Sequence, residues 1–346
     1  MIAPIPSEKN ARNGARVSSK FMRPTIVQRR RGAPPLPVKD GLNPTRVRVP
    51  EGHTGITARD FLTAVIESQR HRHPQDDGSA LAQRFADHEV VDPQGNPLDP
   101  DTALAEHQDV WFYRRPAPEK KVPFDIAILH EDDRLLVVNK PPFLATMPRG
   151  QHITETATVR LRRETGNNDL SPAHRLDRLT SGVLFFVKNP ADRGAYQTLF
   201  ANREVQKTYH AIAPHRPELA SVCPTVWENR IEKTPGEFQA RIVPGEVNAV
   251  TTLADVVPLS DDEHRLLESH HGSQPPLARY VLSPQTGKTH QLRLHMHLAG
   301  APILGDNAYP APLPAAQEDF HRPLRLSATQ LSFRDPFTHD FRTFRL

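Results

Sequence analysis

The run Ala173-His174-Arg175-Leu176-Asp177-Arg178-Leu179-Thr180-Ser181-Gly182 leads directly into the apolar stretch Val183-Leu184-Phe185-Phe186-Val187. Aromatic and β-branched residues in such a stretch predict a buried strand, so the polar run lies at the edge of a core. Loops held by rigid strands are typical positions for catalytic groups, and Asp177 is the carboxylate of this run. A carboxylate between arginines also suits a structural salt-bridge cluster, and the residue types alone slightly favour that interpretation.

Two more segments carry polar residues suited to catalysis. Residues 205–212 predict a strand with Lys207 and Tyr209 on one face, although a tyrosine in a strand usually serves packing. Residues 286–297 hold three histidines and fit an extended strand or a helix equally well. No carboxylate accompanies these histidines at a metal-ligand spacing, so we expect no bound metal. Gly-rich phosphate loops are also missing from the sequence, and we expect no cofactor.

The chain beyond residue 122 predicts an α+β domain, 123–346. Short β-branched runs, such as 135–138, 182–187 and 279–282, are separated by Pro, Gly and Asp turns. Helical signals intervene around 154–164 and 190–202. Because long alternating βαβ units are absent from the sequence, we expect a mixed, largely antiparallel sheet with flanking helices.

Residues 51–115 predict a small N-terminal α/β module. Thr57 can cap a helix that runs through Ile66, and a second helix is predicted over 80–85. The pattern over 90–98 indicates strand, turn and strand, and 110–113 predict a closing strand. This order resembles the alpha-L RNA-binding motif, whereas a docking domain without RNA contact remains the alternative. Residues 116–122 predict a polar linker between the two domains.

The first 50 residues carry an excess of positive charge. They contain eleven Lys or Arg, two acidic residues and eight prolines, a local net charge of +9 against −5 for the remainder. These residues show no hydrophobic periodicity, so we expect a basic, Pro-rich arm that is largely extended or disordered. Within it, residues 46–49 alternate between polar and apolar side chains and could form a short strand. Arg29-Arg30-Arg31 could neutralise nucleic-acid phosphates. A solubilising arm or an organellar transit peptide fits the same composition.

The length of the chain and its cysteine content limit the classes of protein to which it can belong. The chain has 346 residues, enough for one large domain and a smaller one. Cys223 is the single cysteine, which excludes an intramolecular disulfide and a zinc site made of cysteines. The sequence has no stretch of roughly 20 apolar residues and no apolar signal-peptide core. We therefore expect a cytoplasmic protein without a membrane partner, and a monomer by default.

Taken together and in this order, the segments resemble the RluA-type pseudouridine synthase family, from about Phe124 to the C-terminus. The runs 128–133 and 136–141 are similar to the family's opening strand and its Asn-Lys-Pro turn. Residues 174–182 match its HRLDxxTSG motif, and Lys207 with Tyr209 matches its Lys-x-Tyr motif. The run 286–295, followed by 302–306, matches its third motif. Agreement at so many separated segments is hard to obtain by chance.

The resemblance implies an isomerase that converts uridine in RNA to pseudouridine in a central RNA-binding cleft, without a cofactor. It implies that Asp177 is the nucleophile, since a carboxylate can hold the severed fragments together. It further implies that Arg293 pairs with Asp177 and keeps it ionised, because a guanidinium fork matches a carboxylate. Tyr209 would lie against the target base, by stacking and as a candidate general base.

The resemblance also indicates which residues contact the RNA. Extruding a base from RNA costs a few kcal/mol, and Arg175 is the candidate that fills the vacated space. For His174 we favour a structural hydrogen bond over a direct role. The complete set of expected RNA-contacting residues is Arg175, His174, Lys207, Lys288 and His290. Lys288 stands where the family commonly has Arg, and Ser327 stands where it commonly has His.

The target and two other activities stay open at this point. Family members modify ribosomal RNA, transfer RNA or both, and shared catalytic residues do not encode the choice. A non-catalytic RNA-binding or ribosome-assembly protein with the same fold is the main alternative. A carboxylate-based glycosidase that releases free uracil is a third. No obligatory protein partner is indicated by the sequence.

Overall fold

The computed structural model describes residues 25–26, 34–313 and 318–346, which form two compact units. The described residues up to Lys39, together with Asn43–Ala117, make up the first unit. Asp40–Leu42 and Pro118–Leu346 make up the second. Most of the predicted basic arm, including Arg29-Arg30-Arg31, lies outside the described residues.

The first unit is an antiparallel sheet with two helices. Its strands follow the order β1 (Thr25–Ile26), β2 (Thr45–Arg48), β4 (Asp109–Phe112) and β3 (Val90–Val91). The helices are α1 (Ala58–Glu67) and α2 (Gly78–Ala86). As predicted, the Thr57 side chain caps α1, accepting a hydrogen bond from the amide of Asp60. Phe61, Leu62 and Phe112 pack in the core of this unit.

Both predicted boundaries of the arm and the linker need correction. The short strand predicted at 46–49 is present at 45–48, but it belongs to the sheet of the first unit and not to the arm, because Val47 is fully buried in the core of that unit. The second unit begins at Pro118, inside the predicted linker. There the carboxylate of Glu119 accepts hydrogen bonds from the amides of Ile153 and Thr154 at 2.9 and 2.7 Å. These bonds fix a segment whose polarity alone indicated a free connection.

The second unit contains a ten-stranded sheet and a short hairpin. The sheet's strands are β5 (Ala127–Glu131), β6 (Leu135–Lys140), β7 (Ser171–Pro172), β8 (Ser181–Val187), β9 (Gln206–Pro214), β10 (Thr225–Asn229), β13 (Ala249–Pro258), β14 (Leu277–Pro284), β15 (Leu326–Arg334) and β16 (Phe341–Arg345). The hairpin is β11 (Ile231–Glu232) and β12 (Arg241–Ile242). The helices are α3 (Ala157–Thr165), α4 (Arg193–Ala201), α5 (Pro217–Ala220), α6 (Asp261–His271) and α7 (Gln291–Leu298).

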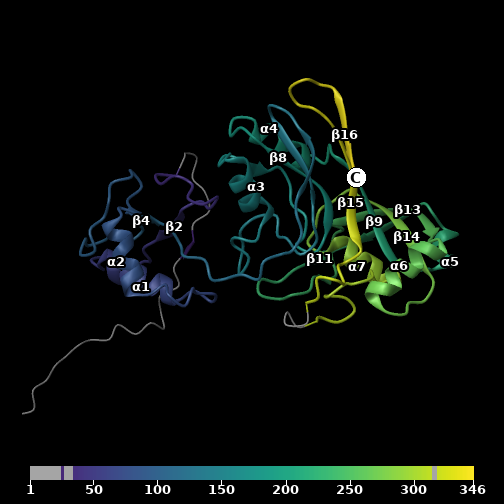
Figure 1. Cartoon of the computed structure of the whole chain (residues 1–346), viewed down its shortest axis with the longest axis horizontal. Helices are drawn as coiled ribbons and strands as arrows, with labels where there is room; N and C mark the ends of the chain where they lie inside the picture. The colour runs from purple at the N-terminus through teal and green to yellow at the C-terminus, as the bar shows by residue number, and fades with distance from the viewer. Residues whose placement is uncertain (1–24, 27–33, 314–317) are drawn as a thin grey trace, which may run out of the picture. The chain divides into compact units, whose positions relative to one another are not determined.

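The strand order β10-β13-β14-β9-β15-β8-β6-β5 confirms the predicted α+β class with a mixed, largely antiparallel sheet. In Figure 1, β8, α3 and α4 lie to one side of β15 and β9, and β13, β14, α5 and α6 lie to the other. Among the described strand pairs, only β8 and β15 run parallel. Residues of α7 pack on the sheet through Leu292 and Met296.

The parallel pairing of β8 and β15 explains the glycine that ends the quoted run. Gly182 has φ +114°, and a Cβ there would lie 2.2 Å from the carbonyl oxygen of Ala328. Only glycine adopts this backbone conformation without strain and also leaves room for the neighbouring strand. The strand that follows Asp177 is therefore held against β15 at its first residues.

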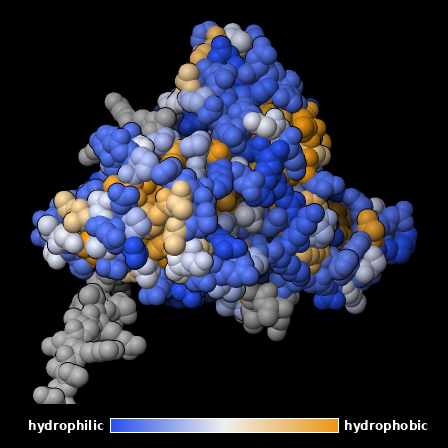
Figure 2. All heavy atoms as spheres, turned by 60° about the vertical axis from the view of Figure 1, so that its left-hand side comes forward, coloured by the Kyte–Doolittle hydropathy of each residue, from blue (hydrophilic) through white to orange (hydrophobic). Residues whose placement is uncertain are grey.

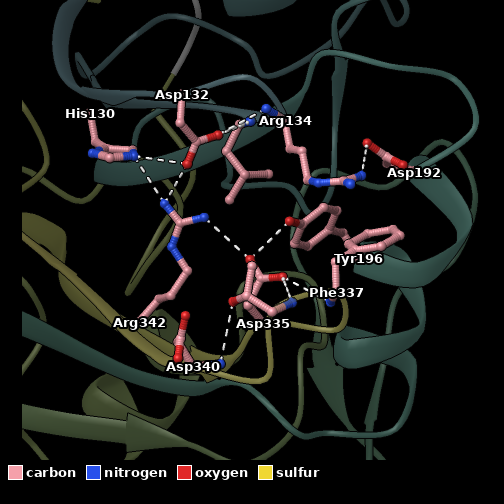
Figure 3. Close-up of polar contacts among 11 residues, drawn as sticks. His130, Asp132, Arg134, Asp192, Tyr196, Asp335, Phe337, Asp340 and Arg342 are labelled. Atoms are coloured by element: carbon pink, nitrogen blue, oxygen red, sulfur yellow. Dashed lines mark hydrogen bonds and ion pairs between the residues drawn. The ribbon is translucent and has the colours of Figure 1, made fainter.

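A partly buried polar network ties the C-terminal hairpin β15–β16 to the turn before β6 and to α4 (Figure 3). Arg342 donates to Asp132 at 2.6 Å and to Asp335 at 3.2 Å. The hydroxyl of Tyr196 on α4 donates to the same Asp335 at 2.9 Å. Neighbouring Arg134 donates to Asp192 at 2.8 Å. Helix α4 leads into β9, and β9 forms one wall of the candidate active site. The network therefore holds the helix that precedes this wall.

Replacing Tyr196 with Phe is expected to lower the free energy of unfolding by about 1–3 kcal/mol, because the variant cannot form the buried hydrogen bond to a charged acceptor. Urea denaturation of wild type and variant measures the difference. Tyr113→Phe is a matched control, since the Tyr113 hydroxyl bonds the carbonyl of Pro37 at an exposed position. Equal decreases in the two variants would contradict the importance given to the polar network.

The face of the molecule drawn in Figure 2 is mainly polar. Hydrophilic residues dominate the face in Figure 2, and apolar residues show on it as separate patches. Among the described residues, no helix has the length and apolar character needed to cross a membrane.

Candidate active site

The loop that carries Asp177 is anchored on both sides of the carboxylate. Before it, the hydroxyl of Thr146 donates to the carbonyl of Leu176 at 2.8 Å and accepts from its amide at 3.1 Å. After it, the ammonium of Lys140 donates to the carbonyl of Arg178 at 3.2 Å. Two flanking anchors hold the backbone of this loop in one place, so the carboxylate is presented from a rigid support.

Lys140 is completely buried and is a positioning residue whose role the sequence patterns did not indicate. Its ammonium also donates to the carbonyls of Pro141 and Leu144, at 2.8 Å each. Burial lowers the pKa of Lys140 to about 7, and the negative charge of Asp177 acts in the opposite direction. The lysine at the end of β6 therefore joins the turn after that strand to the Asp177 loop.

Asp177 faces the N-terminus of helix α7. One carboxylate oxygen of Asp177 accepts a hydrogen bond from the amide of His290 at 3.3 Å, and His290 is the N-cap of α7. His290 has φ +59°, a left-handed conformation that is uncommon for residues other than glycine. Helix N-termini carry partial positive charge, which attracts acidic side chains placed there. The third segment therefore forms a loop and a helix, which decides between the two interpretations that its pattern allowed.

The three segments meet around one cavity of about 610 Å³ in the second unit. Its walls come from the Asp177 loop, the turn between α4 and β9, the strand β9, and the loop 284–290 with the start of α7. The cavity is lined by all the site residues expected from the sequence, namely His174, Arg175, Asp177, Lys207, Tyr209, Lys288, His290 and Arg293. Asp177 is the only acidic residue among the described residues that line it.

Arg293 does not form the expected ion pair with Asp177. Its guanidinium donates to both carboxylate oxygens of Asp306, at 2.8 and 2.5 Å, and to the side-chain oxygen of Asn307 at 3.0 Å. The side chains of Arg293 and Asp306 are 3% and 1% exposed. Asp306 accepts with both of its carboxylate oxygens, which is the bidentate arrangement typical of a strong ion pair with arginine. Asp177 forms no ion pair with any described residue, and the expectation of a direct pairing is corrected accordingly.

Tyr209 lies in the cavity wall on β9, partly buried against the core. Burial raises the pKa of its phenol well above the usual range, and the charge of Asp177 raises it further. The phenol therefore stays protonated near neutral pH. This state suits stacking and hydrogen-bond donation, and it disfavours the candidate role of Tyr209 as a general base.

His174 packs by its ring, and its imidazole also forms a hydrogen bond with the backbone of Arg175. The imidazole stacks on Phe200 with ring centroids 4.5 Å apart, and Nε2 is buried without a hydrogen-bond partner in the described part of the chain. Burial lowers the pKa of His174 to about 3, and the charge of Lys207 contributes to the decrease. The neutral ring of His174 therefore packs the Asp177 loop against Phe200 of α4.

Aromatic side chains from segments that are far apart in the sequence pack around His290. Tyr309 lies edge-on against His290 with ring centroids 5.8 Å apart, and His297 stacks on Tyr309. Phe238 of the loop between β11 and β12 contacts His290 from a half-exposed position. The sequence patterns did not predict this column, because nothing in them relates residues 238 and 309 to the third segment. They did not indicate Arg203, another cavity residue, either.

The histidines do not form a metal site with acidic residues. No group of three or more His, Cys, Asp or Glu side chains suited to a metal ion occurs in the described ranges. His295, on α7, is instead buried beside Trp227 with ring centroids 6.1 Å apart. Neither ring nitrogen of His295 has a hydrogen-bond partner among the described residues.

The second unit is expected to become less stable between pH 6.5 and 4. Burial lowers the pKa of His295 and of His290 to about 4, with Arg293 contributing at His290. The unfolded chain, with histidine pKa values near 6.5, binds protons over this interval that the folded unit does not. Stability therefore falls as the pH drops, by roughly 3 kcal/mol for His295 alone.

Urea unfolding at pH 7.5, 6 and 5 measures this decrease. The chain has two tryptophans, so a Trp111→Phe background lets the fluorescence of Trp227 report the second unit alone. In that background His295→Leu should flatten the pH dependence. An identical pH dependence with and without His295 would show that this buried imidazole is not responsible.

Comparison with known proteins places the matching region in the second unit. Residues 134–298 match the family described as RNA pseudouridylate synthase. The tRNA pseudouridine synthase C of Vibrio parahaemolyticus is 32% identical over 230 residues, covering 63% of this chain and 88% of that protein. The dual-specificity RNA pseudouridine synthase RluA of Pasteurella multocida is 34% identical over 226 residues, covering 63% and 90%. The solved human RNA pseudouridylate synthase domain containing 4 is 26% identical with a TM-score of 0.45, covering 64% and 87%.

Proposed function

The chain belongs to the RluA-type family of RNA pseudouridine synthases, isomerases that act on uridine in RNA, and we propose that Asp177 is its catalytic nucleophile. The observation that carries this proposal is the position of Asp177 as the only acidic residue among the described residues lining the cavity. Its anchored loop and the facing N-terminus of α7 support the same role. A carboxylate that is fixed in place and forms no ion pair with the described residues is available to attack.

The isomerisation breaks the bond between ribose C1′ and N1 of uracil and joins C1′ to C5 of the same ring. The proton on C5 leaves, and N1 gains a proton, so the reaction needs no oxidant and no second substrate. Asp177 acts in one of three ways: it forms a transient bond to C1′ or to the ring, which breaks again as C1′ joins C5, or it takes a proton from C2′ and returns it as C1′ joins C5. We propose that Tyr209 stacks on the uracil, and that Arg175 fills the space from which the base is extruded.

We propose that Arg293 contributes to the active site without acting as the direct counter-ion of Asp177. Its pairing with Asp306 fixes the start of α7, and Asp306 in turn accepts from the amides of Ala308 and Tyr309 at 2.7 and 3.0 Å. Tyr309 supports His290, whose amide bonds Asp177. We propose that Arg293 positions this support and lends positive charge to the cavity, while Lys207, Lys288 and His290 contact the RNA.

The proposed substrate is ribosomal or transfer RNA in the cytoplasm. The relatives' names support this range, since one is called a tRNA enzyme and the other dual-specific. The first unit lies outside the matched residues 134–298 and is a candidate for choosing the RNA. We propose that the enzyme acts as a monomer, without an obligatory protein partner and without a cofactor.

Product analysis tests the reaction and the target together. Purified protein is incubated with RNA carrying tritium at uracil C5, and the digested nucleosides are separated. Tritium release with pseudouridine in the digest supports the proposal; free uracil would indicate a glycosidase, and unchanged uridine a binding protein. Pseudouridine mapping of ribosomal and transfer RNA from cells with and without the gene then identifies the target. An unchanged set of pseudouridines in cells without the gene would contradict both proposed substrates.

A further inference from the structure

Two cations of the cavity lie together at the turn between α4 and β9. The helix ends at Ala201, and Arg203 follows with φ +63°, a conformation that costs a non-glycine residue free energy. Lys207 lies near the start of β9, on the strand face that also carries Tyr209. Both cations line the cavity that contains Asp177.

Neither cation has an anionic partner. Within the described part of the chain, the side chains of Arg203 and Lys207 form no hydrogen bond and no ion pair. The adjacent carboxylate of Glu204 accepts from the side-chain amide of Asn202 at 2.9 Å instead. Lys207 is half-buried, and its pKa is lowered by burial and by the charge of Arg203. The two side chains therefore repel each other across partly desolvated space.

Three other arginines of this unit that are buried or partly buried have carboxylate partners. Arg293 pairs with Asp306, Arg134 with Asp192, and Arg342 with Asp132 and Asp335. Two neighbouring cations without a carboxylate destabilise the free protein, and a bound anion removes this repulsion. The pair is therefore preorganised for an anionic ligand that enters the cavity from solvent.

We propose that Arg203 and Lys207 form a subsite for one phosphodiester group of the RNA, next to the uridine that lies at Tyr209. Residues two apart on a strand are separated by about 7 Å, so Lys207 lies one step outward from the base contact. The Arg203 fork can bind two phosphate oxygens, and Lys207 adds a point charge. The proposal rests on uridine binding in the Asp177 cavity, and it assigns Arg203 and Lys207 to positioning.

RNA affinity as a function of salt concentration is the first test. Arg203→Gln, Lys207→Gln and the double variant are prepared in an Asp177→Asn background, so that RNA binds without turnover. The probe is the transcript that pseudouridine mapping identifies. Each single variant should bind about tenfold more weakly at 150 mM KCl. The slope of log affinity against log salt should become shallower by about 0.7–0.9, because the variant neutralises one phosphate fewer and releases fewer counterions.

Matched variants separate this role from a structural one. Arg345→Gln removes a cation on β16, outside the cavity, and should leave both affinity and slope unchanged. Arg203→Lys should retain most of the affinity. Removing either repelling charge should leave the thermal midpoint equal or higher. A lower midpoint in both Gln variants would indicate a structural role and overturn the proposal.

Neutral linkages locate the phosphate. A single methylphosphonate is placed at each position around the target uridine in turn. One position should weaken binding to the Asp177→Asn protein and have no further effect on the double Gln variant. A parallel decrease for both proteins at every position would overturn the phosphate subsite. Absence of tritium release by wild type would instead count against the proposed reaction, and the binding measurements do not depend on it.

Discussion

Replacing Asp177 with Asn is expected to abolish tritium release from uracil C5, lowering turnover by about 10⁴-fold or more. An amide has nearly the shape of a carboxylate but no nucleophilic negative charge, so the cavity stays intact while the attacking group is removed. The side-chain oxygen of Asn can still accept the hydrogen bond that the His290 amide gives to Asp177. Folding and RNA affinity should therefore remain close to wild type.

The assay measures tritium release under single-turnover conditions, with RNA binding measured separately. Asp133→Asn is the matched control, because Asp133 is an exposed aspartate outside the cavity. It should retain full activity. Wild-type rates in the Asp177 variant would remove this residue from the mechanism, and a variant that neither binds RNA nor turns it over would point to a structural role.

Local patterns marked the three segments, and the family resemblance was needed to predict that they build one site. The polar run at 174–182 lies at the start of a buried strand, as its apolar continuation indicated. The alternation at 205–212 placed Lys207 and Tyr209 on one face, and both line the cavity. These predictions succeeded because a strand's period of two assigns side chains to faces without knowledge of distant contacts.

The partner of Arg293 could not be predicted in the same way. Asp177 and Asp306 are both carboxylates near motif residues, and residue type does not choose between them. The choice depends on the turn 306–309, where the amides of Ala308 and Tyr309 fix the carboxylate of Asp306 toward α7. Such a choice is a tertiary property. The burial of Lys140 and the column from Phe238 to His297 depend likewise on contacts between distant segments.

The place of Arg203 in the cavity could not be predicted from the sequence, for a related reason. A single arginine in a polar turn has no periodicity, and solvent-exposed arginines are common. Its importance follows from its neighbour Lys207 and from the absence of an ion pair at either side chain among the described residues. A sequence shows which charges are present, whereas the fold determines which of them remain uncompensated.

The pairing of Arg293 with Asp306 predicts a large loss of stability when the carboxylate of Asp306 is removed. Replacing Asp306 with Ala is expected to lower the free energy of unfolding of the second unit by about 3–5 kcal/mol. The change leaves the guanidinium of Arg293 buried without a counter-charge, and a lone buried charge is costly. It also removes the acceptor for the amides of Ala308 and Tyr309. Activity should fall as well, since His290 is no longer supported.

Denaturation by urea, followed by Trp227 fluorescence in the Trp111→Phe background, compares Asp306→Ala with Asp177→Ala. The observed pairing predicts a large decrease in stability for Asp306→Ala and one below about 1 kcal/mol for Asp177→Ala, because the latter breaks a single long hydrogen bond. If Arg293 were paired with Asp177, the order would be reversed. The double variant Arg293→Met with Asp306→Ala should recover part of the stability, because it removes the buried charge itself. A double variant as unstable as the sum of its parts would show that the two side chains stabilise the unit independently.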